Sequence, residues 1–242
     1  MQELGLYDIK IGNILFLDIE TVPLWASYDD LDETSRTLWD KKAQKISRTE
    51  DQTPQELYQR AGIYAEFGKV VCISCGFVSP DNKIRIKSFA AENEQILLND
   101  FASLLNGSYA SAEKILCAHN GKEFDFPFIA RRMLINGIKL PNILQIAGKK
   151  PWEINHLDTM ELWKFGDYKN YTSLALLTHV FNIPTPKDDI QGSDVYEIYW
   201  QNNDLKRIVI YCQKDVVAII QLFQKYRNEP LFGENDIVIA NI

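Results

Sequence analysis

The sequence is poor in cysteine, has no long apolar run and carries no excess of positive charge. Its four cysteines, in a chain of 242 residues, are too sparse for a disulfide scaffold. No stretch approaches the roughly 18 to 20 consecutive apolar residues of a membrane span, and the opening MQELGLYDIK lacks the basic-then-apolar pattern of a signal peptide. We therefore expect a globular protein that resides in the cytoplasm and does not contact a membrane.

Two of the cysteines form a CxxC pair, which raises the question of a metal or redox site. Cys72 and Cys75 lie within VVCISCGFV, an apolar run typical of a buried strand. Residues three apart on a strand point to opposite faces of the sheet, and a zinc site also needs a second ligand pair, which the sequence lacks. We interpret both residues as reduced core thiols.

The formal net charge of −7 argues against a protein that coats duplex nucleic acid, because phosphate neutralisation needs a basic surface. The charge is compatible with an enzyme whose active site gathers carboxylates and neutralises them with bound cations. A nucleotide kinase or NTPase is disfavoured, since the sequence contains no GxxxxGK[ST] loop.

Strand and helix patterns alternate along most of the chain and predict one α/β domain over residues 1–242. Strands are expected at four places, of which the second and third form a hairpin around the turn SPDNK: 14–20, 70–78, 84–89 and 114–120. Helical spacing covers 93–105, about 125–137, about 173–181, about 194–201 and about 204–227. This order describes a mixed sheet flanked by helices.

Residues 24–68 do not fit the alternating pattern. They are polar, contain the acidic run DDLDE at 29–33, and show weak helical periodicity around 31–46 and 54–64. We interpret them as a helical insertion between the first two strands. A solvated excursion is favoured over a lid or substrate clamp, and both stay open.

The first strand, ILFLDIE, carries two acids on an otherwise apolar element. Asp18 and Glu20 share one face with Ile14 and Phe16, and the other face is also apolar, so the strand is expected to be central. Burying two carboxylates is costly unless a cation meets them, which points to a metal. The alternative is that the strand ends at Asp18 and both acids reach water.

The last helical segment places another acid in an apolar stripe. At about 100° per residue, Asp215 falls in one narrow sector with Ile208, Cys212 and Ile219. Tyr211 precedes it by four residues and lies on the same edge of the helix. Asp215 is either a metal ligand or a buried acid satisfied by a lysine or a backbone amide, and this segment alone leaves the two equally open.

A fourth acid, Asp125, follows the strand at 114–120 and stands at the expected start of a helix. The positive end of the helix dipole favours a carboxylate there, so a capping role is the default. Lys122, Arg131 and Arg132 lie close by in sequence and would suit contacts with backbone phosphates. Solvated charges on a helix face are nevertheless the favoured interpretation of each arginine.

Together, FLDIETVP, HNGKEFDFPF and YCQKD, in that order, resemble the DEDD superfamily of 3′-5′ exonucleases, also called DnaQ-like. The Tyr-x-x-x-Asp form of the last motif is similar to the DEDDy branch. The nearest resemblance is to predicted exonucleases related to the proofreading domain of family-B DNA polymerases, and it covers about residues 13–227 outside most of the insertion. It implies a ribonuclease H-like fold with a central mixed five-stranded sheet flanked by helices.

The resemblance also implies roles for individual residues. The catalytic residues it implies are Asp18, Glu20, Asp125, Tyr211 and Asp215. The four acids among them would bind two Mg²⁺ or Mn²⁺ ions, since hard oxygen ligands select hard cations. The implied contacts to the terminal nucleotide come from Thr21, Asn120 and Phe124.

Two residues near these motifs have competing interpretations. Asp158 looks like part of a family feature, but it precedes Glu161 by three residues as in a capping box, and a structural role is favoured. Phe126 is either a core residue or an aromatic platform for a base, and the two are evenly balanced.

The sequence thus predicts an enzyme that hydrolyses single-stranded DNA from its 3′ end by a two-metal mechanism. An exoribonuclease acting on RNA is one alternative. A catalytically silent nucleic-acid-binding domain is another, although its expected signature, the loss of an acid, is absent. The sequence does not identify a polymerase or repair partner.

Overall fold

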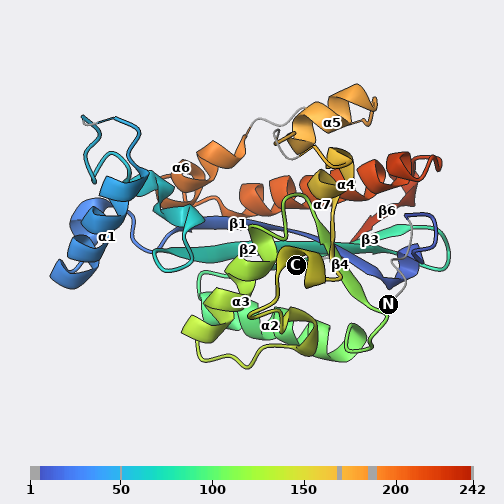
Figure 1. Cartoon of the computed structure of the whole chain (residues 1–242), viewed down its shortest axis with the longest axis horizontal. Coiled ribbons are helices and arrows are strands. Elements are labelled where there is room, and N and C mark those ends of the chain that lie inside the picture. The colour runs from blue at the N-terminus through green and yellow to red at the C-terminus, as the bar shows by residue number, and fades with distance from the viewer. Residues whose placement is uncertain (1–5, 50, 168–170, 185–189, 241–242) are drawn as a thin grey trace.

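The computed structural model describes residues 6–49, 51–167, 171–184 and 190–240. Within them one sheet has six strands in the order β5-β4-β1-β2-β3-β6 (Figure 1). Strands β1, β2 and β3 are antiparallel neighbours, whereas β4 is parallel to β1, β5 to β4 and β6 to β3. The strands are β1 Ile14–Pro23, β2 Gly68–Val78, β3 Ile84–Ala90, β4 Ile115–Ala118, β5 Leu157–Asp158 and β6 Ile237–Ile239.

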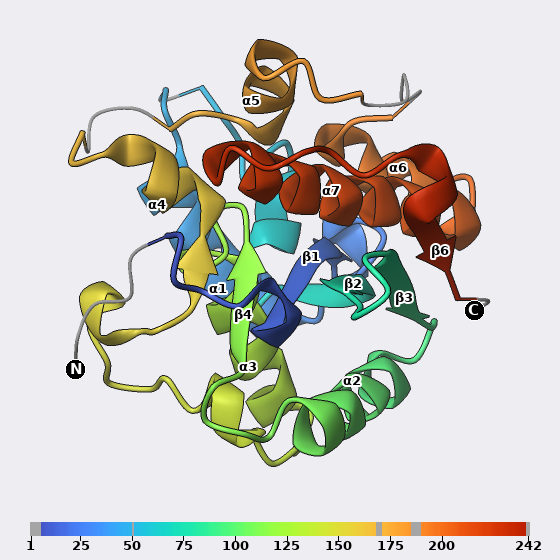
Figure 2. The same ribbon diagram turned by 90° about the vertical axis from the view of Figure 1, so that its right-hand side faces the viewer.

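Helices cover both faces of the sheet, as Figure 2 shows with the sheet between two helical layers. One layer consists of α2 Glu94–Ser108 and α3 Asp125–Ile135. The other consists of α4 Thr159–Lys164, α5 Leu174–Val180, α6 Val195–Trp200 and α7 Leu205–Tyr226. Short 3-10 helices are η1 Ile11–Asn13, η2 Tyr28–Asp30, η3 Tyr58–Ile63, η4 Asn142–Leu144, η5 Pro151–Glu153, η6 Gly192–Asp194 and η7 Glu234–Asp236.

Strand β1 is central because helices cover both of its faces. Leu15 and Leu17 belong to the apolar cluster that β1 shares with α2 and α3. On the other face, Phe16 meets Phe223 of α7 edge to face, with ring centroids 5.5 Å apart. The apolar pattern on both faces of ILFLDIE therefore predicted the position of this strand correctly.

The structure confirms the α/β class and the mixed sheet flanked by helices. The hairpin of β2 and β3 and the helices α2, α3, α5, α6 and α7 lie where periodicity placed them. The expected number of five strands is wrong, because β6 pairs with the free edge of β3. A three-residue strand is too short to show alternation, and it forms because the edge offers unpaired backbone groups. The other five strands have the ribonuclease H-like order.

Residues 24–68 form a small structure of their own beyond one end of β1 and β2, where α1 Glu33–Ile46 lies (Figure 1). Trp39 is fully buried there, donates its indole N–H to the carbonyl of Pro54 at 2.8 Å, and meets the ring of Tyr58 edge to face. The expected helix at 54–64 is instead the 3-10 helix η3. That this segment is an insertion into a single domain stays a prediction.

The four cysteines are free and buried, as expected for reduced core thiols. Cys72 packs in the cluster that faces α7, while Cys75 packs in the cluster that faces α2 and α3. Residues three apart on β2 thus lie on opposite faces of the sheet. Over the described ranges, no helix combines the length and the apolar character needed to cross a membrane.

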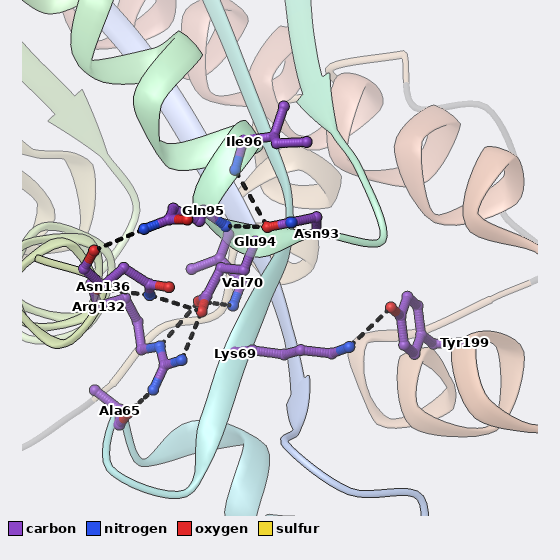
Figure 3. Close-up of polar contacts among 10 residues, drawn as sticks. All are labelled: Ala65, Lys69, Val70, Asn93, Glu94, Gln95, Ile96, Arg132, Asn136 and Tyr199. Atoms are coloured by element: carbon purple, nitrogen blue, oxygen red, sulfur yellow. Dashed lines mark hydrogen bonds and ion pairs between the residues drawn. The ribbon is translucent and has the colours of Figure 1, made fainter. Parts of the chain in front are cut away.

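A buried ion pair joins α2 to α3 (Figure 3). Arg132 Nε donates to Glu94 Oε1 at 2.9 Å, and the two side chains are only 5% and 8% exposed. Glu94 also accepts from the backbone N–H of Val70 at 2.8 Å and from Asn136 Nδ2 at 3.0 Å. The carboxylate therefore ties β2, α2 and α3 together at one point.

The expectation of a solvated Arg132 is wrong, and so is a contact of this residue with substrate phosphate. Its guanidinium is committed to Glu94 and to the carbonyl of Ala65, to which Nη1 donates at 2.8 Å. Arg131, the preceding residue, is exposed as expected. Helical periodicity placed Arg132 on α3, but the partner that makes its burial possible comes from another helix.

Removing Glu94 should strongly destabilise the protein. In Glu94→Ala, Arg132 stays buried without its counter-ion, so the free energy of unfolding should fall by about 3 to 5 kcal/mol in urea denaturation. The matched control is Glu92→Ala, which removes an exposed carboxylate two residues away and should change stability by no more than about 0.5 kcal/mol. Equal effects of the two substitutions would contradict this account.

Candidate active site

Strand β1 presents Asp18 and Glu20 on the face that α7 covers. In the antiparallel ladder Asp18 is opposite Ser74 and Glu20 is opposite Cys72, and a bulge follows between Glu20 and Thr21. The ligand atoms of Asp18, Glu20 and Cys212 of α7 lie within 4.8 Å of one another. The strand does not end at Asp18, so the alternative in which both acids simply reach water is excluded for Glu20, which is buried.

Helix α7 brings Tyr211 and Asp215 to the same place. Ile208, Cys212 and Ile219 are fully buried, which confirms the apolar stripe expected of this helix. Asp215 interacts electrostatically with both Asp18 and Glu20, and the Tyr211 phenol is hydrogen-bonded to the Asp215 carboxylate. The Asp215 carboxylate therefore lies close enough to Asp18 and Glu20 for their negative charges to repel one another.

The third element is the start of α3, where Asp125 is the first helical residue. The residue preceding the helix is Phe124, and no side-chain capping bond forms there. Asp125 is only 3% exposed, and its Oδ1 has no hydrogen-bond partner among the described residues. An unsatisfied buried carboxylate oxygen is costly, and it is the kind of group that a cation would satisfy.

Burial and mutual repulsion act together on these acids. Burial is the largest cause that raises the pKa of Asp18, followed by the charges of Glu20, Asp125 and Asp215. The pKa of Glu20 is raised by burial and then by Asp215, and burial also raises the pKa of Asp125. Acids from three distant segments thus face one another, and their donor set of carboxylate oxygens fits hard divalent cations.

The loop between β4 and α3 is held by Asp158. The Asp158 carboxylate accepts hydrogen bonds from the backbone N–H of Asn120 at 2.9 Å, of Lys122 at 3.1 Å and of Met160 at 2.9 Å. It caps α4 through the last of these, which confirms the structural interpretation. Asn120 has a positive φ of 64°, a conformation that asparagine tolerates better than most residues. Asp158 therefore fixes the approach of the chain to Asp125.

The two phenylalanines beside Asp125 differ in their surroundings. Phe126 is fully buried and packs edge to face on His156 with ring centroids 5.2 Å apart, so it is a core residue and no platform for a base. Phe124 is half-buried and lies against Phe128. Thr21, directly after the bulge of β1, is also half-buried. Phe124 and Thr21 therefore each keep a surface that solvent reaches.

Sequence reasoning missed a buried polar network under α7. Ser74 and Ser88 share a hydrogen bond of 2.9 Å across β2 and β3, and Gln213 Nε2 donates to Ser88 Oγ at 2.9 Å. Cys212 Sγ donates to the backbone carbonyl of Asp18 at 3.3 Å. The signal was the presence of small polar residues at inward positions of two apolar strands. These contacts fix α7 against the strand that carries the acids.

The fold and this geometry define an α/β protein with a centre of four buried or half-buried acids suited to divalent cations. The chain belongs to the family described as predicted 3′-5′ exonucleases related to the exonuclease domain of PolB, whose model matches residues 63–230. This membership confirms the resemblance expected from the three motifs, and with it the class of a nuclease, a phosphodiester hydrolase.

Two solved structures are similar to this chain. The family B DNA polymerase from the hyperthermophilic archaeon Pyrobaculum calidifontis is 17% identical with a TM-score of 0.49, over 85% of this chain and 23% of that one. Exonuclease I of E. coli in complex with a dT13 oligonucleotide is 10% identical with a TM-score of 0.43, over 89% of this chain and 42% of that one. The chain thus spans less than half the length of either.

The family match begins at residue 63 and so contains the second and third motifs but not β1. Asp18, Glu20 and Thr21 lie outside the matched range. It is the sheet that brings Asp18 and Glu20 beside Asp125 and Asp215, because β1 lies between β4 and β2 and directly under α7.

Ionisation of the metal-free centre should destabilise the protein. Folded Asp125 has a pKa raised from 3.8 to about 8, so the folded state binds more protons than the unfolded chain between these values. In chelator, the free energy of unfolding should therefore fall as the pH rises from about 4 to about 8. Asp125→Asn should make this dependence shallower.

Thermal unfolding in excess Mg²⁺ or Mn²⁺, compared with thermal unfolding in chelator, tests whether the centre binds these cations. Either ion should raise the thermal midpoint of the wild type at neutral pH, because it binds the folded state only. The gain should be much smaller in Asp18→Ala. Two outcomes would contradict this account of the centre. One is a free energy of unfolding in chelator that rises from about pH 4 to about pH 8. The other is an equal gain in thermal midpoint for the wild type and for Asp18→Ala when either ion is added.

Proposed function

We propose that this protein is a 3′-5′ exonuclease that hydrolyses single-stranded DNA and uses two divalent cations, Mg²⁺ or Mn²⁺. The observation that carries the proposal is the meeting of four carboxylates from β1, α3 and α7. One of them, Asp125, has a buried oxygen with no hydrogen-bond partner in the part of the chain that the structure describes. The relation of the family to the exonuclease domain of PolB favours DNA over RNA.

Asp18, Glu20, Asp125 and Asp215 are the residues that would hold the cations. Bound divalent ions supply charge stabilisation for the phosphoryl oxygens and for the leaving oxygen, and they make an attacking water more acidic. The carboxylates position these charges, and the surrounding apolar core keeps their ligand atoms from turning away. Their cluster is rigid because β1 is covered on both faces and α7 is anchored by the Ser88–Gln213 hydrogen bond.

Tyr211 is assigned to orienting the attacking water. Burial, the largest cause, raises the pKa of Tyr211, and without cations the charges of Asp215, Glu20 and Asp18 raise it further. Because burial persists when cations bind, the phenol stays protonated. A protonated phenol held by Asp215 fixes the direction of a water molecule, while it is a poor general base. Orientation of the water is therefore favoured over its deprotonation by Tyr211.

The terminal nucleotide would meet Thr21, Asn120 and Phe124. Thr21 follows the β1 bulge next to Glu20, and Asn120 and Phe124 belong to the loop that leads to Asp125. Phe124 is half-buried, so part of its ring is open to a base, and aromatic side chains stack with bases in sites for single strands. These three residues border the acids from both the β1 side and the α3 side.

The proposal is tested with 5′-labelled DNA and RNA of the same sequence, with magnesium or manganese and with chelator. The wild type should shorten DNA one nucleotide at a time from the 3′ end. Asp18→Ala should lose more than about 10²-fold in rate, since even partners of metal ligands cost about 10- to 100-fold. Tyr211→Phe should keep a measurable rate, reduced by up to about 10²-fold, because only positioning is lost.

The matched control is Asp100→Ala, which removes an exposed carboxylate of α2 on the opposite face of the sheet and should leave the rate unchanged. Equal rates of wild type and Asp18→Ala would refute the assignment of the centre. A ladder on RNA alone would identify an exoribonuclease, and binding without cleavage of either polymer would identify a silent binding domain.

A further inference from the structure

Lys69 of β2 lies on the face of the sheet that carries the acids. In the β1–β2 ladder Glu20 is opposite Cys72, and Lys69 is opposite Val22, the next β1 residue on the same face. Val22 and Cys72 belong to one buried cluster with Cys212 of α7. Glu20 and Val22 are two residues apart on the strand, a distance of about 7 Å. The backbone position of Lys69 is therefore beside the acid centre, toward the end of β1.

The ammonium of Lys69 is held against two aromatic side chains of α6. Its Nζ donates to the hydroxyl of Tyr199 at 3.0 Å, as Figure 3 shows. The same Nζ lies 4.7 Å from the ring centroid of Tyr199 and 4.7 Å from that of Trp200. Trp200 in turn donates its indole N–H to the carbonyl of Pro23 at 3.2 Å. The two rings and the cation are thus fixed at the end of the strand that carries Asp18 and Glu20.

The Lys69 ammonium has no carboxylate partner among the residues that the structure describes. An ammonium carries three N–H donors, and the Tyr199 hydroxyl accepts one of them. Lys69 is half-buried, so salt screens its charge less than it would on an open surface. A weakly screened cation without a counter-ion favours an anionic ligand.

Half-buried aromatic rings continue from the acid centre to Lys69. Tyr211 of the centre, Tyr199 and Trp200 all pack against the same buried cluster beneath α6 and α7. Each of the three is half-buried, so solvent reaches part of its surface. Aromatic rings interleaved with a cation are typical of sites for single-stranded nucleic acid, in which rings contact the bases and the cation binds phosphate. A free inorganic anion would make no use of the rings.

We propose that Lys69, Tyr199 and Trp200 form a subsite for the single strand, in which Lys69 binds a backbone phosphate on the 5′ side of the bond to be cut. The proposal rests on the proposed function, since it takes the acids as the position of the 3′ terminus. The strand then passes from the acid centre over Tyr211 to Lys69. The rings of Tyr199 and Trp200 contact the nucleotide next to this phosphate and select no base sequence, because every base has a π face.

The first test compares Lys69→Met with the matched control Lys87→Met. Lys87 of β3 also lies over an aromatic ring, that of Phe89 at 4.8 Å, but it is opposite Cys75 on the other face of the sheet. Affinities for labelled oligothymidylate and for thymidine 5′-monophosphate are measured with calcium replacing magnesium to prevent hydrolysis. Lys69→Met should lose about tenfold in affinity for the oligonucleotide, because a charge-assisted hydrogen bond is lost. It should bind the mononucleotide as the wild type does, since that ligand reaches only the acid centre.

Lys87→Met should bind both ligands like the wild type, and Lys69→Arg, which keeps the charge, should recover most of the loss. The slope of log affinity against log salt should become shallower by about 0.7 in Lys69→Met, the value for one phosphate of a single strand. An equal loss for the oligonucleotide and the mononucleotide would overturn the proposal, because Lys69 would then act on the acid centre. An equal effect of the two methionine substitutions would overturn it as well.

Neutral linkages identify the phosphate. Oligothymidylates with one uncharged methylphosphonate linkage, moved stepwise from the 3′ end, are bound to the wild type and to Lys69→Met. At one linkage upstream of the bond to be cut, the neutral group should weaken binding to the wild type and should weaken binding to Lys69→Met no further. Additive losses at every linkage would refute the subsite, because Lys69 would then only anchor α6.

Failure of the subsite and failure of the proposed function are separable. If the wild type hydrolyses neither DNA nor RNA with magnesium or manganese, the proposed function fails, and the linkage scan still decides whether Lys69 binds a phosphate. If the wild type is an exonuclease but Lys69→Met binds like Lys87→Met, the subsite alone is refuted. Binding is measured at a temperature at which thermal unfolding shows every variant to be folded, so that a weaker affinity is not due to unfolding.

Discussion

The arrangement of this protein depends on keeping four carboxylates close together inside an apolar sheet domain. Strand β1 keeps Glu20 buried and Asp18 half-buried, because helices cover both of its faces. Burial and repulsion from Asp125 and Asp215 consequently raise their pKa values. Such a centre costs stability by itself and gains it when cations bind, so its chemistry and its energetics have the same origin.

Polar contacts outside the centre hold its members in place. Asp158 fixes the loop before Asp125 through three backbone N–H groups. The Glu94–Arg132 pair ties α3 to α2 and β2, and the hydrogen bond of Gln213 ties α7 to β3. Each of these groups is buried, and a buried polar group with its partners is rigid. The acids therefore face one another through supports drawn from the whole domain.

Charge is distributed unevenly over α7. One edge of the helix carries Tyr211 and Asp215 toward the acids of β1, and the neighbouring row carries Lys206 and Lys214. The net charge of −7 sums the acids of the centre with the lysines of this row, so it does not show how the two are divided between neighbouring edges of α7.

The sequence by itself determined the α/β class, the hairpin, most helices and the motifs of the acids, because periodicity and motif spacing are local properties. It did not determine β6, the burial of Arg132, the core position of Phe126 or the hydrogen-bonded serines of β2 and β3. Each of these depends on a partner distant in the chain, such as Glu94 for Arg132. Only the tertiary structure decided that β1, outside the family match, lies beside α3 and α7, because strand pairing and helix packing join residues that no local pattern relates.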